Sequence, residues 1–165
     1  IVHLAADGTE LWRGGDFNSP LTVSANTSDG SCWVADRNNN RVVHLASDGS
    51  TLWSGDSFAL PSWVSVDSIT GSCWVSDIDH GQVVLLSQTG GEIARAGGFT
   101  GAWSVSADEG HARCWVAETS TGTVVLLELE YSLDLSGSNG SIEVDGVPQS
   151  LPWSCLLYTS PSPRD

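Results

Sequence analysis

Two short loops of this chain carry side chains that could bind a cation or a polar ligand. The first loop reads DRNNNR and places Asp36, Asn38 and Asn40 at alternate positions. Alternating carboxylate and amide oxygens suit Ca²⁺, which takes about six to eight hard oxygen ligands. The same side chains can instead bond their own backbone as Asx turns and close the loop. Both interpretations are open here, and Ca²⁺ is the one cofactor that these residues permit.

The second loop, DIDHGQ, repeats this pattern with changes and offers Asp77, Asp79 and His80. Neither loop is followed by the Glu that completes many calcium loops, and a third loop, ETSTGT, has lost the pattern. In the first loop, Arg41 is placed to pair with Asp36 as a local clasp. The other two loops have no Arg at that position, so they could not repeat the salt bridge.

Tryptophan supplies a second candidate surface. Trp63 and Trp103 fall in short apolar segments beside loops, and aromatic side chains at the rim of a site stack on sugars or hold peptides. The alternative is that both belong to the core. Trp33, Trp74 and Trp115 recur at one position of a repeat, and we predict that they lie between packed sheets.

The remaining reactive side chains form no catalytic set. His3 and His44 are equivalent in the repeat, and Leu85 and Leu126 take the same place later. A position that accepts leucine is a packing position. No serine stands in a Gly-x-Ser-x-Gly pattern, and the Asp-Gly pairs are turn signals. We therefore assign no catalytic residue and no metal site.

These candidates are placed by an internal repeat, because Cys32, Cys73 and Cys114 recur 41 residues apart. Val and Leu positions obey the same register. In one unit we expect four short strands, at residues 21–25, 31–36, 41–46 and 51–54, with turn signals between them. The second strand is apolar on both faces, which indicates a sheet packed between two others. A four-stranded unit of about 40–45 residues that stacks on copies of itself is typical of a β-propeller blade.

The unit that contains DGSCWVADRNNNRVVHLASDG resembles the NHL repeat. The resemblance is closest over residues 20–58. It departs from the pattern over 61–99, where Gln82 replaces the Arg, and further over 101–129, where Glu118 and Thr123 replace the Asp and the Arg. It implies an all-β propeller fragment over residues 1–129, with strands of a preceding blade at 1–13. About three blades should form an open arc rather than a closed ring.

After Leu127 the period fails. Residues 130–154 resemble the opening of a divergent internalin-B-type repeat, a small β-domain of secreted bacterial proteins; a degenerate fourth blade is the alternative. Residues 155–165, CLLYTSPSPRD, resemble a translated sequencing adapter and fit neither pattern. Met is absent and Ile1 opens inside the pattern, so we expect a truncated chain, such as a metagenomic fragment.

Composition narrows the class of partner. The 165 residues carry 20 acidic and 6 basic side chains, a net charge of −14. Such a surface disfavours nucleic acid, because phosphate binding needs clustered cations. No apolar run approaches the ~18 residues of a membrane span, so no membrane insertion is expected. The repeat places equivalent cysteines ~10 Å apart, too far for disulfides, so we predict free thiols.

The sequence therefore favours a non-catalytic binding or scaffold module of a secreted or cell-surface bacterial multidomain protein. Its ligand would be a protein, a peptide or a carbohydrate. Some NHL-like propellers are lyases that hold a metal through His from several blades. The alternative is thus a metal-dependent lyase or hydrolase whose site lies in blades that this chain lacks. The sequence defines neither the ligand nor the oligomeric state.

Overall fold

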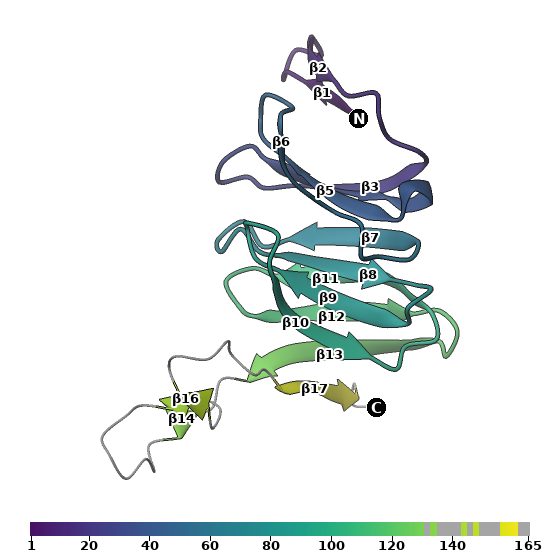
Figure 1. The fold of residues 1–165 in the computed structure, drawn as a ribbon, viewed down its shortest axis with the longest axis vertical. Coiled ribbons are helices and arrows are strands. Elements are labelled where there is room, and N and C mark those ends of the chain that lie inside the picture. The colour runs from purple at the N-terminus through teal and green to yellow at the C-terminus, as the bar shows by residue number, and fades with distance from the viewer. Residues whose placement is uncertain (131–132, 135–142, 145–146, 149–155, 162–165) are drawn as a thin grey trace.

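The fold is a stack of antiparallel sheets that follow one another in chain order (Figure 1). The computed structural model describes residues 1–130, 133–134, 143–144, 147–148 and 156–161. Three sheets have four strands, and a two-stranded hairpin precedes them. The predicted fold class is confirmed: the chain is all-β, its blades are four-stranded and antiparallel, and the arc is open.

The strands of the stack agree with the repeat. The hairpin is formed by β1 (Val2–Leu4) and β2 (Glu10–Arg13). Blade 1 contains β3 (Pro20–Ala25), β4 (Cys32–Asp36), β5 (Arg41–Leu45) and β6 (Thr51–Gly55). Blade 2 contains β7 (Pro61–Val66), β8 (Cys73–Asp77), β9 (Gln82–Leu86) and β10 (Glu92–Gly97). Blade 3 contains β11 (Ala102–Asp108), β12 (Arg113–Glu118), β13 (Thr123–Glu130) and β17 (Leu156–Pro161). A single 3-10 turn, η1 (Arg37–Asn39), is the helical element of the described residues.

Residues near the C-terminus add two features. Three two-residue strands, β14 (Leu133–Asp134), β15 (Glu143–Val144) and β16 (Val147–Pro148), pair into a small sheet. The rest of 130–154 lies outside the described residues, so the internalin-type interpretation stays a prediction. β17 pairs antiparallel with β13, and the unpaired edge of a strand accepts almost any extended segment. This pairing therefore leaves the proposed adapter origin of 155–165 a prediction.

The hydrophobic core lies between neighbouring blades. Trp33 of β4 is fully buried in the cluster between blades 1 and 2, and Trp74 of β8 is buried between blades 2 and 3. Trp115 holds the same repeat position in blade 3, yet 44% of it is exposed because no described blade covers that side. The same dependence on a covering blade holds on the third strand, where the exposed fractions are 0% for Val42, 0% for Val83 and 50% for Val124. The prediction that these tryptophans lie between packed sheets is therefore confirmed for Trp33 and Trp74 and wrong for Trp115.

In the hairpin and in blade 1, a tryptophan on the outermost strand inserts into the following blade, whereas blade 2 has Ala94 at this position. The ring of Trp53 on β6 fills the space above Gly90, where an added Cβ would lie 2.2 Å from the ring. Gly90 has a φ of +86°, in the left-handed region that favours glycine. Trp12 on β2 covers Gly49 in the same way. These contacts couple the edge of one sheet to the turn of the next.

The innermost strands are joined by side-chain hydroxyls. The N–H of Val66 donates to Ser24 Oγ over 3.0 Å, and the N–H of Ala107 donates to Ser65 Oγ over 2.9 Å. Both bonds join the first strand of one blade to the first strand of the next, at the same repeat positions. They satisfy backbone donors on an edge that has no neighbouring strand in its own sheet.

His44 is a buried inter-blade contact. Its ring stacks on Trp33 with centroids 4.2 Å apart and an interplanar angle of 7°. Nδ1 lies 3.1 Å from the carbonyl oxygen of Gln88 in blade 2, so Nδ1 carries the proton, and Nε2 accepts from Ser31 Oγ at 3.0 Å. This neutral imidazole agrees with the predicted packing role. Burial lowers the pKa of His44, although the Gln88 carbonyl and the Asp29 carboxylate act in the opposite direction.

We expect this histidine to make stability depend on pH. The unfolded chain protonates His44 near its usual pKa of about 6.5, whereas the folded chain takes up that proton only at lower pH. The unfolded state therefore binds more protons below about pH 6.5. As the pH is lowered through this range, the free energy of unfolding decreases by at most about 1.4 kcal/mol per pH unit. Urea denaturation at pH 7.5 and 5.5 measures the fall. His44→Leu, which copies Leu85, should reduce it, and an unchanged pH dependence in that variant would contradict the assignment.

Two further sequence predictions concern the state of the cysteines and membrane insertion. Cys32, Cys73 and Cys114 are free thiols, as predicted, and burial raises the pKa of Cys73 and Cys114 above the ordinary range. Among the residues that the structure describes, no helix has the length and apolar character needed to cross a bilayer.

Candidate functional site

The predicted polar loops gather on one face of the stack, which we call the loop face. It consists of residues 36–41, 77–82 and 118–123, the inter-blade segments 17–19, 58–60 and 99–101, and Trp103, which contacts Arg37. In each blade an acidic side chain ends the second strand and accepts a backbone N–H from the preceding inter-blade segment. Asp36 accepts from Asn18 at 2.7 Å, Asp77 from Ala59 at 2.7 Å, and Glu118 from Thr100 at 2.8 Å. The repeated acid therefore joins two loops.

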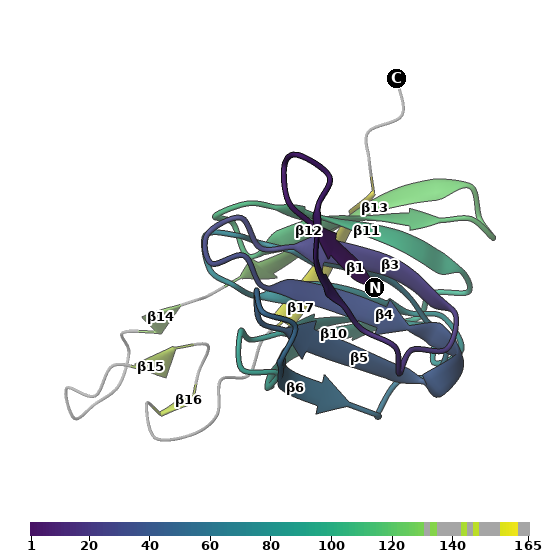
Figure 2. The ribbon, with the colours of Figure 1, turned by 90° about the horizontal axis from the view of Figure 1, so that it is seen from above.

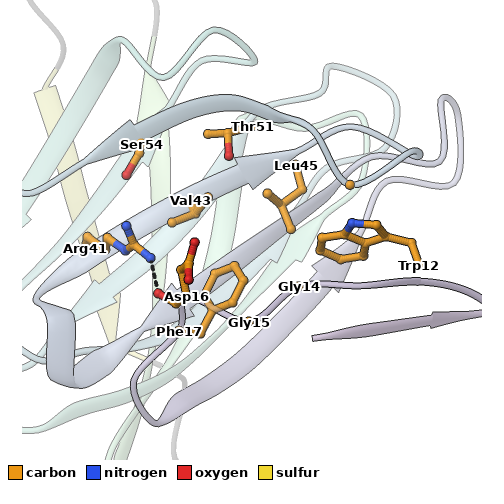
Figure 3. A pocket seen from close by; sticks show the side chains of 11 residues that line it. Trp12, Gly14, Gly15, Asp16, Phe17, Arg41, Val43, Leu45, Thr51 and Ser54 are labelled. Atoms are coloured by element: carbon orange, nitrogen blue, oxygen red, sulfur yellow. Dashed lines mark hydrogen bonds between the residues drawn. The ribbon is translucent and has the colours of Figure 1, made fainter.

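The carboxylate of Asp36 is fully buried and occupied by protein donors. Its Oδ2 accepts from Asn39 Nδ2 at 2.8 Å and from Arg41 Nε at 2.6 Å. The predicted clasp between Arg41 and Asp36 is thus confirmed. Arg41 also donates from Nη2 to the carbonyl oxygen of Asp16 at 2.6 Å. Figure 3 shows this bond at one end of a cavity of about 180 Å³ that extends to Trp12.

Blade 2 uses other donors for the same purpose. Asp77 is also fully buried, and its Oδ2 contacts His80 Nδ1 at 2.8 Å and Gln82 Nε2 at 2.9 Å. Gln82 thus supplies a hydrogen bond where blade 1 has a salt bridge. Asn40 Oδ1 accepts from the N–H of Leu60 at 3.1 Å and joins blade 1 to blade 2. These contacts give the loops a structural role, but they are not the expected Asx turns, because Asp36, Asp77 and Asn40 bond the backbone of inter-blade segments and not that of their own loops.

Only some of the residues of the predicted site are exposed. Asn38, Asn40, Asp79 and His80 are exposed on the loop face, although His80 also contacts the buried Asp77. Within the described ranges, no group of three or more His, Cys, Asp or Glu side chains could hold a metal ion. Ca²⁺ binding by these loops stays a prediction, and it would require the hydrogen bonds of the buried carboxylates to be exchanged for metal bonds.

The two predicted rim tryptophans differ in burial. Trp63 is partly buried and packs against the core between blades 2 and 3. Trp103 is 42% exposed. Its backbone is fixed by Ser62, whose Oγ donates to the Trp103 carbonyl oxygen at 2.9 Å. The Cζ atom of Arg37 lies 5.8 Å from the centroid of the Trp103 ring, a cation–π contact between blade 1 and blade 3.

Arg37 is a functional candidate that the sequence reasoning missed. Each of the other arginines among the described residues contacts a carboxylate: Arg13 with Glu10, Arg41 with Asp36, Arg95 with Glu92, and Arg113 with Asp108. Arg37 has no such partner there, and its Nε is buried without a hydrogen bond. In a chain of net charge −14, this cation lies beside an exposed indole. The two side chains form a compact anchor for a ligand.

Comparison with known proteins supports the fold. Residues 17–45 match the NHL repeat family model, and no curated protein matches the chain. Similar solved structures include a nidogen/laminin complex, with 19% identity, a TM-score of 0.60 and coverage of 76% of this chain and 49% of that one. Virginiamycin B lyase from Staphylococcus aureus has 13% identity, a TM-score of 0.57 and coverage of 90% and 48%. Hydrazine synthase from Kuenenia stuttgartiensis has 10% identity, a TM-score of 0.55 and coverage of 89% and 51%.

The chain spans about half the length of these structures. They include enzymes and a protein complex, so the likeness establishes architecture and leaves activity unspecified. The 41-residue register, the four-stranded blades and the family match lead to one conclusion. The chain contains an NHL-like segment of a β-propeller.

Proposed function

We propose that the chain is a non-catalytic binding module that contacts a protein partner through its loop face. The observation that carries this proposal is the exposed indole of Trp103 beside the guanidinium of Arg37, for which the described residues supply no carboxylate. Trp and Arg are enriched among the residues that dominate binding energy at protein interfaces. The propeller scaffold supports the proposal because stacked repeats present broad, rigid surfaces.

The chemistry of this pair defines the segment of the partner that it would hold. A guanidinium without its own carboxylate prefers a carboxylate from outside, and an exposed indole prefers an apolar or aromatic group. The proposed ligand is therefore a peptide segment with an acidic group next to an apolar side chain. A neutral carbohydrate would use the indole but would leave the cation without a charged partner.

The cellular setting is part of the same proposal. A secreted or surface-attached multidomain protein would agree with the acidic composition and with the resemblance of residues 130–154 to a domain of secreted proteins. A nidogen/laminin complex is among the similar structures. The alternative function is a metal-dependent lyase or hydrolase, which is suggested by the lyase among those structures.

A peptide selection tests the binding proposal. Random peptides displayed on phage are selected on the immobilised chain, and enriched sequences are resynthesised for calorimetry. We expect acidic peptides whose affinity falls at least about tenfold in Trp103→Ala, as for a hot-spot tryptophan. Arg37→Gln should also weaken binding and reduce its dependence on salt.

Trp115→Ala is the matched control, because Trp115 is as exposed as Trp103 but lies on the end face of blade 3. We expect no change in affinity for that variant. Enriched peptides that bind Trp103→Ala and Arg37→Gln as tightly as the unchanged chain would reject the loop face as the binding surface.

A further inference from the structure

A cavity of about 180 Å³ lies between the hairpin and the outer strands of blade 1, β5 and β6. The hairpin lies over blade 1 in the view along the stack (Figure 2), and Figure 3 shows the cavity from close by. Val43 and Leu45 of β5 form its floor and are only 3% and 2% exposed. Trp12 and Phe17 pack against this floor. Both walls of the cavity therefore belong to this chain.

The cavity exists because blade 1 has small residues on its outermost strand. In the hairpin and in blade 2, this strand carries a Glu–Arg ion pair three residues apart. The pairs are Glu10–Arg13 and Glu92–Arg95. At the same repeat positions β6 has Thr51 and Ser54, which line the cavity. A short hydroxyl side chain thus stands where both neighbours have a long, charged one.

The interface between blades 1 and 2 shows what fills the equivalent space. Ser54 pairs with Val43, which faces the hairpin. Arg95 pairs in the same way with Val84, which faces blade 1. Arg95 extends from there to Gln82 and donates from Nη1 to Gln82 Oε1 over 3.0 Å. Because Ser54 is too short for such a contact, the open volume is a property of the residues on β6.

Two aromatic rings bound the cavity at its ends. The Trp12 ring lies against Gly14 and Gly49, where an added Cβ would clash with it, so the indole is held in one orientation. Phe17 lies at the other end, where the Cζ atom of Arg41 is 5.6 Å from the centroid of its ring. A flat aromatic surface with polar groups beside it suits a ligand that is apolar on one face and polar at its edge.

The polar groups of the cavity include both signs of charge. Arg41 forms its ion pair with Asp36, and its bond to residue 16 goes to the carbonyl oxygen. Neither contact uses the Asp16 carboxylate, which can accept from a ligand, and Thr51 and Ser54 add hydroxyls that both donate and accept. A cation would be repelled by Arg41 and an anion by Asp16. The set therefore favours a neutral ligand with several hydroxyls.

We propose that this cavity binds one ring of a neutral carbohydrate. The cavity is smaller than the ~300 Å³ at which pockets for drug-sized ligands begin, so it holds a single sugar ring and leaves the rest of a glycan outside. The C–H face of the ring packs on the Trp12 indole. At the edge of the ring, one hydroxyl donates to the Asp16 carboxylate, and its neighbour accepts from Arg41.

This site goes beyond the peptide anchor on the loop face. Arg37 and Trp103 join blade 1 to blade 3, whereas the cavity lies between the hairpin and blade 1. The two sites have no residue in common, so either proposal can fail without the other.

Methyl glycosides test the proposal on the unchanged chain. The probes are the methyl pyranosides of glucose, galactose, mannose and xylose, and saturation-transfer NMR with tryptophan fluorescence titration measures their binding. We expect saturable binding of at least one of them at one site per chain. The amino and uronic acid forms of the same sugar should bind at least about tenfold more weakly, because each places a charge next to a like charge.

Substitutions on β6 locate the sugar. Thr51→Glu with Ser54→Arg copies the pair of the two neighbouring strands and fills the cavity without removing a core side chain. This double variant should abolish binding and should not lower the thermal midpoint. Ser57→Arg is the matched control, because it adds the same charge at an exposed position between blades 1 and 2, and it should keep the affinity. Asp16→Asn should weaken binding about tenfold through the loss of a charged acceptor.

Four results would overturn the proposal. The first is that none of the four glycosides binds. The second is an unchanged affinity in the double variant of β6, and the third is tighter binding of a charged form of the sugar. The fourth is a loss of affinity in Trp103→Ala, which would place the sugar on the loop face.

Discussion

Replacing Gly90 with alanine should lower the free energy of unfolding by about 3 kcal/mol, the sum of backbone strain and overpacking. Gly90 has a φ of +86°, which L-residues with a Cβ adopt at a cost. The new methyl would also lie 2.2 Å from the ring of Trp53, so the turn or the indole would have to shift to make room for it. Urea denaturation followed by tryptophan fluorescence measures the loss.

Two controls separate the strain from the clash. Gly98→Ala has a similar φ of +92° but no atom within 4 Å of the added methyl, so it should cost only about 1 to 2 kcal/mol. In a Trp53→Ala background, Gly90→Ala should cost the same smaller amount. If Gly90→Ala is equally damaging with and without Trp53, the indole does not fill this space in solution.

Asp36→Ala should lower the free energy of unfolding by a comparable amount, about 3 kcal/mol, because it leaves several donors without an acceptor. The buried carboxylate accepts from the backbone of Asn18, from Asn39 and from Arg41. Its removal therefore frees the loop face of blade 1 as well as Arg41. Chemical denaturation of the variant and the unchanged chain gives the difference.

The matched control is Asp79→Ala, since Asp79 is an exposed aspartate on the loop face of blade 2. We expect a change within about 0.5 kcal/mol, as for most surface substitutions. Asp36→Asn keeps an acceptor for the N–H of Asn18 but removes the negative charge that pairs with Arg41. Its free energy of unfolding should therefore lie between those of Asp36→Ala and Asp79→Ala. A neutral effect of Asp36→Ala would show that the loops hold together without this carboxylate.

Most of the architecture could be predicted from the sequence because the same residue pattern is repeated in each blade. Cys-Trp at the start of the second strand and Arg-Val at the start of the third located β4 and β5 to within one residue. The two-sided apolar pattern also indicated which side chains face each neighbour. These features depend on the period of two in strands and on the register of 41 residues, and both can be counted.

The anchor on the loop face could not be predicted in this way. Arg37 occurs once, and the repeat equivalents in the other blades are Ile78 and Thr119. Its contact with Trp103 joins blade 1 to blade 3, so no local spacing reveals it. The pairing of Trp53 with Gly90 had a weak signal, since Trp12 and Gly49 repeat it. That signal has meaning only when the blades are stacked in space.

The hydroxyl bonds between innermost strands have a consequence for the shape of the arc. At the inner side, neighbouring blades approach as closely as a serine Oγ and a backbone N–H, 3.0 Å apart for Ser24 and Val66. At the outer side, the same two blades are held apart by the indole of Trp53. The interface between blades 1 and 2 is therefore a wedge, thin at its inner side and thick at its outer side. This gradient of side-chain size favours curvature between these two blades, and we expect that exchanging the small and large residues of its two ends would reduce the angle between them.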